Sequence, residues 1–126
     1  MAYLVDINIM VDFTRGNAKA ADYLDSLGGT CLLSSITALE LIGGARSQRE
    51  VSDLDVMNSA YDQVPPTADI ARRTHYLMKT HAKSAGLQTL DALIAATALE
   101  EGLTLATKNR KHFEMIGDLN LGVPNY

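Results

Sequence analysis

The sequence has only one cysteine and no tryptophan among its 126 residues. A single cysteine cannot form a disulfide within the chain, so the core has to stabilise the fold without cross-links. A chain of this length is large enough to do so. Cys31 lies in an apolar run, which indicates a small buried hydrophobic residue rather than a reactive thiol. One cysteine is also compatible with a reducing compartment.

Two further features are missing from the sequence. No apolar run approaches the roughly 20 residues of a membrane span, and the first residues lack the basic segment and apolar core of a secretion signal. We therefore expect a cytoplasmic protein with no membrane contact. The net charge of −4 argues against non-specific attraction to nucleic acid. It does not exclude an enzyme that acts on nucleic acid, because a bound divalent cation would offset part of an acidic site.

Apolar runs of strand length alternate with helical periodicities along the chain. Strands are predicted at residues 2–6, 30–34, 103–107 and 119–123. Helices are predicted at 8–14, 18–27, 36–47, 48–63, 68–85 and 90–101, with a polar turn or short helix from Asn109. Two prolines at 65–66 limit residues 64–67 to a very short edge strand at most. The alternation predicts one domain, residues 1–126, with a three-layer α/β/α sandwich around a mainly parallel sheet of four or five strands.

Three carboxylates occupy special positions in this pattern. Asp6 ends the first strand, Glu40 follows the second strand by about one helical turn, and Asp91 begins the apolar helix before the next strand. Right-handed crossovers would bring all three to the same end of a parallel sheet. Oxygen ligands of this kind suit Mg²⁺ or Mn²⁺. His75 and His81 are six residues apart on one predicted helix and are interpreted as surface residues rather than as zinc ligands.

Each carboxylate also has a purely structural interpretation, which the sequence leaves open. Asp6 and Asn8 could form an Asx turn or cap the next helix. Thr37 and Glu40 match the spacing of a capping box. Asp91 could simply favour the positive end of its helix. Three such residues in one small domain favour a shared site, because their mutual repulsion would otherwise cost stability.

Four segments, in order, resemble PIN-domain ribonucleases, and in particular the VapC toxins of type II toxin–antitoxin modules. They are YLVDIN at 3–8, SITALEL at 35–41, DALIAATA at 91–98 and ATKN at 106–109. The resemblance extends over about residues 3–113, nearly the whole chain. It implies a PIN-like fold, cleavage of RNA, a cognate antitoxin and a homodimer, for which the apolar helical region 36–61 is a candidate interface. Ordinary core packing is the favoured alternative for most residues of that region.

The resemblance also implies roles for individual residues. Asp6, Glu40 and Asp91 match the acidic catalytic residues, and Asp6 and Asp91 match the direct Mg²⁺ ligands, which Mn²⁺ could replace. Asn8 and Thr107 match the polar residues that support the site. Three positions depart from the family: Ile7 replaces a common hydroxyl residue, Asn109 stands where many members have an aspartate, and His112 stands where another acid is common. These departures favour one metal ion rather than two, with Asn109 in a supporting role.

The predicted reaction is hydrolysis of an RNA phosphodiester bond by a metal-activated water. Lys108, Arg110 and Lys111 lie beside the site in the sequence and are candidate RNA phosphate contacts, although a solvated turn is an equal alternative. Two other functions remain open. A non-catalytic PIN-like module that binds RNA or protein is compatible with Asn109. A metal-dependent phosphomonoesterase is disfavoured, because Asn8 stands where its second carboxylate would be.

Overall fold

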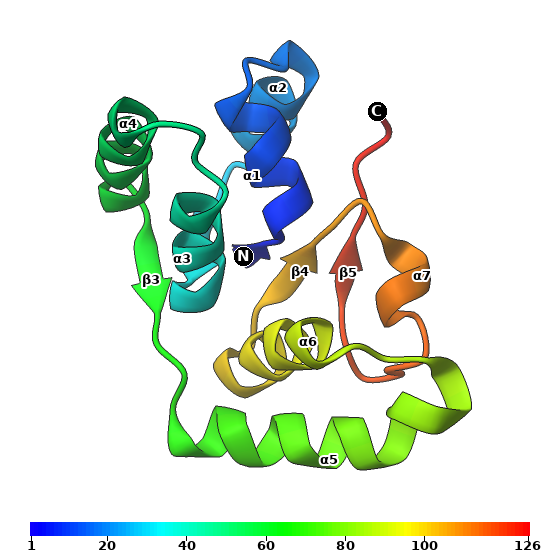
Figure 1. Ribbon diagram of the computed structural model, residues 1–126. Coiled ribbons are helices and arrows are strands. Elements are labelled where there is room, and N and C mark those ends of the chain that lie inside the picture. Colours follow the sequence, from blue (N-terminus) through cyan, green and yellow to red (C-terminus); the bar gives the residue numbers. More distant parts are fainter.

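A five-stranded parallel sheet forms the centre of the computed structural model, which describes residues 1–126 (Figure 1). The strands are β1 (Ala2–Val5), β2 (Thr30–Ser34), β3 (Asp62–Val64), β4 (Thr104–Ala106) and β5 (Leu121–Gly122). The helices are α1 (Ile7–Thr14), α2 (Ala18–Ser26), α3 (Ser35–Gly43), α4 (Gln48–Ser59), α5 (Ala68–Ala85), α6 (Thr89–Glu101) and α7 (Arg110–Phe113). The predicted α/β class and the parallel sheet are confirmed.

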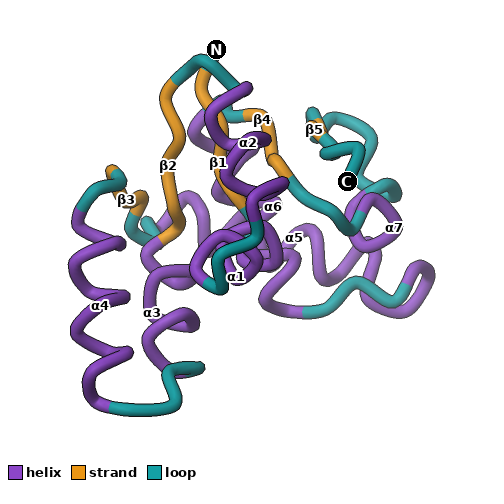
Figure 2. The backbone as a smooth tube through the Cα atoms, turned by 90° about the horizontal axis from the view of Figure 1, so that it is seen from above, coloured by secondary structure: helices purple, strands orange, loops and turns teal.

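Helices cover both faces of the sheet, as the apolar centres of its strands require. Successive strand residues point to opposite faces, so Leu4 packs in a cluster with α5 and α6 while Val5 packs in a second cluster with α1, α3 and α4. Leu105 and Ala106 divide between the same two clusters. Figure 1 shows α5 and α6 on one side of β4 and β5, and α1 and α2 on the other. Figure 2 shows β1 between β2 and β4.

The strand order β3-β2-β1-β4-β5 places the first strand in the middle. The chain builds one half of the sheet outward from β1 through β2 and β3, and then returns to build the other half through β4 and β5. The order therefore reverses at β1. In open α/β sheets, the carboxyl end of the strand at this reversal is the usual ligand-binding crevice. Asp6 is the first residue after β1.

The termini of α5 follow the signals in the sequence. Thr67 accepts a hydrogen bond from the amide of Ile70 and caps the start of the helix. Gly86 ends it in the left-handed conformation, at φ 72°. Glycine adopts this conformation without the steric cost that a Cβ atom adds. No helix in the structure combines the length and the apolar character needed to cross a membrane.

Two helix predictions were too long at their C-terminal ends. The helix predicted for 48–63 ends at Ser59, and residues 62–64 instead form the edge strand β3 beside β2. Pairing with β2 provides hydrogen-bond partners for the backbone there and buries Val64 in the core, so a strand forms in place of the end of the predicted helix. The helix predicted for 36–47 ends at Gly43, where Gly44 closes its last turn onto the carbonyl of Glu40.

The capping-box interpretation of Thr37 and Glu40 was also wrong. Ser34 caps α3, with its hydroxyl accepting a hydrogen bond from the amide of Ile36. Thr37 is buried inside the helix, and its hydroxyl has no hydrogen-bond partner. Glu40 is therefore not needed to complete the cap, and its carboxylate is available for another role.

Candidate functional site

Hydrogen bonds made by its amide and by both oxygens of its carboxylate hold Asp6 at the carboxyl end of β1. Its amide donates to the carbonyl of Ala106 at 2.9 Å, which extends the pairing of β1 with β4. One carboxylate oxygen accepts from the amide of Ile7 at 2.9 Å and so caps α1. The other oxygen, Oδ2, accepts from the hydroxyl of Thr107 at 2.7 Å. The capping role left open by the sequence is thus present, and it fixes the orientation of the carboxylate.

The burial of Asp6 has an electrostatic cost. Asp6 is only 4% exposed, and this burial raises the pKa of its carboxyl above the ordinary value. The hydrogen bonds from Thr107 and Ile7 lower the pKa, while the nearby charge of Asp91 raises it. The charge of His112 lowers the pKa slightly, but no lysine or arginine pairs directly with the Asp6 carboxylate.

Glu40 and Asp91 complete an acidic cluster with Asp6. Burial raises the pKa of Glu40, and repulsion from Asp6 and Asp91 raises it further. Asp91 lies in the first turn of α6, as predicted, and its Oδ2 is 3.2 Å from Nδ1 of His112. The carboxylates that follow β1 and that lie in α3 and α6 therefore repel one another.

The acidic cluster fits a divalent cation by the chemistry of its donors. Only hard oxygen ligands are present in it, and their mutual repulsion is what a cation would relieve. No group of three or more His, Cys, Asp or Glu side chains is close enough together in this structure to hold a metal ion. Mg²⁺ does not require such a group, because it usually keeps several waters and binds through one or two carboxylates. Asp6 and Asp91 could supply those two carboxylates.

The predicted supporting residues differ in how closely they contact the acidic cluster. Thr107 is fully buried, and besides donating to Asp6 its hydroxyl accepts from the amide of Asn109 at 3.0 Å. The side chain of Asn109 does not cap α7. Asn8 lies half-buried in the first turn of α1. Of these three residues, only Thr107 forms a side-chain hydrogen bond to an acidic residue.

The three predicted RNA contacts also differ. Nζ of Lys108 is 2.7 Å from Oδ2 of Asp12, so its charge is already paired. Arg110 and Lys111 are exposed on α7. The phenol of Tyr126 donates to the same oxygen of Asp12 at 3.0 Å. Sequence analysis did not predict this arrangement, because no local motif links residues so far apart.

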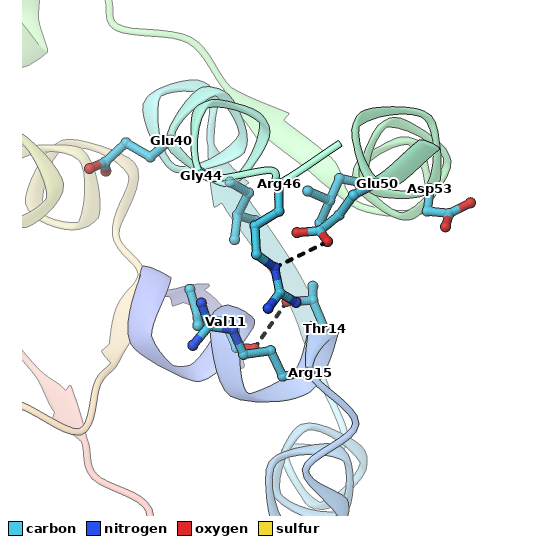
Figure 3. A pocket seen from close by; sticks show the side chains of 10 residues that line it. Val11, Thr14, Arg15, Glu40, Gly44, Arg46, Glu50 and Asp53 are labelled. Carbon is cyan, nitrogen blue, oxygen red and sulfur yellow. Dashed lines mark hydrogen bonds and ion pairs between the residues drawn. The ribbon is translucent and has the colours of Figure 1, made fainter. Parts of the chain in front are cut away.

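A cavity of about 560 Å³ opens beside Glu40, between α1, α3 and α4 (Figure 3). Its walls carry both charge signs: Arg15 and Arg46 on one hand, Glu40, Glu50 and Asp53 on the other. Arg46 is paired with Glu50, with 3.5 Å between Nε and Oε2. Figure 3 shows the Glu40 carboxylate projecting from α3 away from this pair. One member of the acidic cluster, Glu40, thus lines this cavity.

Comparison with known proteins gives consistent results. Residues 3–118 match the model of the PIN domain family. Ribonuclease VapC19 of Mycobacterium tuberculosis is 37% identical over 120 residues, which cover 92% of this chain and 95% of that protein. Ribonuclease VapC10 of the same organism is 38% identical, with 92% and 89% covered. A solved toxin–antitoxin complex from Klebsiella pneumoniae contains a chain that superposes with a TM-score of 0.84 at 29% identity, covering 97% of both chains.

Proposed function

The chain belongs to the PIN domain family, and from this premise we propose that it is the toxin of a type II toxin–antitoxin module. It acts as a metal-dependent endoribonuclease that hydrolyses RNA phosphodiester bonds, and a cognate antitoxin neutralises it. The acidic cluster at the reversal of strand order carries the proposal. Relatives named as ribonucleases over nearly their whole length support it.

In the proposed mechanism, each carboxylate has a separate task. Asp6 and Asp91 would hold one Mg²⁺, or Mn²⁺ in its place. Such an ion would supply Lewis-acid chemistry, which polarises a phosphoryl oxygen and lowers the pKa of a water. Glu40 orients the attacking water and accepts its proton. The raised pKa of Glu40 suits this task, since a general base works best when its pKa approaches the working pH. Thr107 keeps Asp6 in place through its hydroxyl.

The proposed partners are an antitoxin and a second copy of the chain. The cavity lined by Glu40 would place an antitoxin segment against one member of the acidic cluster, and its mixed charges suit a polar peptide. For the homodimer, α3 and α4 expose Leu39 and Val56, which are 65% and 71% accessible. Both residues lie within the region 36–61 proposed as an interface.

The test is incubation of purified, antitoxin-free protein with total RNA, in Mg²⁺ or Mn²⁺ and in EDTA. Asp6→Asn and Asp91→Asn are tested beside the wild type. We expect cleavage that needs the metal and is lost in both variants, because each removes a proposed ligand charge. Asp69→Asn is the matched control, since Asp69 lies on the exposed start of α5 and pairs only with Arg72.

Cleavage at equal rates by the wild type and both variants would indicate a contaminating nuclease and contradict the proposal. RNA binding without cleavage by any preparation would favour a binding module that has lost its activity.

A further inference from the structure

Three side chains outside the acidic cluster form a compact group, which we call the Asp12 tie: Asp12, Lys108 and Tyr126. Oδ2 of Asp12 accepts from Nζ of Lys108 at 2.7 Å and from the phenol of Tyr126 at 3.0 Å. The ammonium of Lys108 also lies 5.0 Å from the centre of the Tyr126 ring, a cation–π contact. The tie joins α1, the segment after β4 and the residues after β5.

The tie and the acidic cluster fasten the same two segments to each other. Asp6 caps the start of α1 and Asp12 lies near its end, about 9 Å further along the helix axis. Their partners, Thr107 and Lys108, are adjacent in the sequence. The segment after β4 is thus attached to α1 at two points, one buried and one half-exposed.

The segment that contains Tyr126 supports the same attachment. The amide of Thr107 donates to the carbonyl of Gly122 at 2.9 Å, and Tyr126 follows only four residues later. Its ring packs at a tilt against Tyr23 of α2, with 6.5 Å between ring centres. Thr107 is therefore held on one side by β5 and, through Lys108, on the other side by α1.

We propose that Asp12, Lys108 and Tyr126 are positioning residues that hold the Thr107 hydroxyl against Asp6 and so set the affinity of the acidic cluster for a divalent cation. Lys108 is consequently not an RNA contact. Phosphate contacts from this part of the chain fall to Arg110 and Lys111, which form no ion pair and are exposed. The inference about cation affinity depends only on the acidic cluster, whereas the inference about RNA contacts rests on the proposed function.

The direction in which cation affinity changes when Lys108 is removed distinguishes a positioning role from a direct electrostatic effect. Lys108 is a positive charge near an anionic site, so its removal by itself would strengthen cation binding. If Lys108 acts through Thr107, its removal weakens cation binding instead. Loss of a direct hydrogen-bond partner of a metal ligand costs about 10- to 100-fold in affinity. We expect a smaller loss, of about 3- to 10-fold, for Lys108→Met, which acts one contact further away.

The experiment measures Mn²⁺ binding by isothermal titration calorimetry, without RNA. Lys108→Met and Tyr126→Phe should both weaken binding, while Lys108→Arg should restore most of it by keeping the pair with Asp12. Tyr126→Phe keeps the ring and removes only the hydroxyl, so the fold is preserved. Tyr76→Phe is its matched control, because Tyr76 is 61% exposed on α5 and its phenol makes no hydrogen bond. Unchanged or stronger Mn²⁺ binding by Lys108→Met would overturn the proposal.

A second measurement tests the inference about RNA contacts with a short single-stranded RNA of mixed sequence in EDTA. Losing one phosphate contact lowers the slope of log affinity against log salt by about 0.7 for single strands. We expect that loss for Lys111→Met and an unchanged slope for Lys108→Met; equal losses would overturn the assignment. If the wild type neither cleaves nor binds RNA, the proposed function fails, while the Mn²⁺ titrations still decide whether the tie positions the cluster.

Discussion

Asp6 and Asp12 lie at opposite ends of α1 in opposite electrostatic conditions. Asp6 is buried, accepts hydrogen bonds only from neutral groups, and has a raised pKa because of that burial. Asp12 is half-exposed and pairs with a lysine, and the hydrogen bond from Lys108 lowers the pKa of Asp12. At one end of α1, therefore, the carboxylate of Asp6 is not paired with a lysine or arginine, whereas near the other end the carboxylate of Asp12 is paired with Lys108.

This difference indicates which acidic residues are available for chemistry. A carboxylate already neutralised by the protein gains little from a metal ion, whereas a buried one surrounded by other carboxylates gains much. Glu40 belongs with Asp6, since Asp6 and Asp91 both repel its carboxylate. Asp91 is intermediate between Asp6 and Asp12, because His112 compensates its negative charge only when the imidazole is protonated.

The largest expected effect comes from Glu40→Gln, which neutralises one member of the acidic cluster without changing its shape. A general base contributes about 10²- to 10⁴-fold to a rate, so RNA cleavage should fall by that order at saturating Mg²⁺. The repulsion that raises the pKa of Glu40 disappears at the same time, so the metal-free protein should melt at the same temperature or higher. Single-turnover cleavage and thermal melting measure the two effects.

Glu50→Gln is the matched control for this variant. Glu50 lines the same cavity but is paired with Arg46, so its neutralisation should leave the cleavage rate unchanged. A cleavage rate for Glu40→Gln close to that of the wild type would remove Glu40 from the mechanism and leave Asp6 and Asp91 as the site.

A divalent cation should stabilise the protein more at neutral pH than in acid. The folded-state pKa values of Asp6 and Glu40 lie above their ordinary values of 3.8 and 4.5. Their contribution to stability is therefore complete below those ordinary values and is lost as the pH rises through the raised ones. The cation offsets this loss, by about 2.7 kcal/mol at a hundredfold excess over its dissociation constant.

Thermal melting with Mg²⁺ and with EDTA at pH 4.5 and pH 7 measures this difference. The double variant Asp6→Asn and Glu40→Gln is the control, because it should lose both the cation effect and its pH dependence. An equal shift of the melting temperature at both pH values would show that the cation binds elsewhere.

The sequence predicted the acidic cluster because its positions follow from chain order. Asp6 follows β1 directly, Glu40 lies in the helix that follows β2, and Asp91 lies in the first turn of the helix that precedes β4. Parallel topology gathers such positions at one edge of the sheet. The capping of α1 by Asp6 could also be anticipated from residue type. Secondary structure and crossover handedness were sufficient for these inferences.

The Asp12 tie could not be predicted in the same way. Asp12 and Tyr126 are separated by 114 positions, and their meeting depends on the path of the chain after β5, which no periodicity specifies. The edge strand β3, which the sequence allowed only at residues 64–67, lies at 62–64 for a related reason: these residues become extended because β2 offers them a partner. Contacts made by long-range packing leave no local pattern in the sequence.

The smallest expected effect is the contribution of the Asp12 tie to the stability of the protein, which should disappear in acid. Because the folded-state pKa of Asp12 lies below its ordinary value of 3.8, its pairing stabilises the protein above that value and is lost as the pH falls through the lowered one. For a half-exposed pair this amounts to at most about 1 kcal/mol. Asp12→Asn should therefore be slightly less stable than the wild type at pH 7 and equal to it near pH 2. Urea unfolding of the metal-free proteins at both pH values measures the difference.

A loss of stability in Asp12→Asn that persisted in acid would mean that Asp12 acts through packing rather than charge. The contrast between Asp12 and Asp6 would then rest on burial alone.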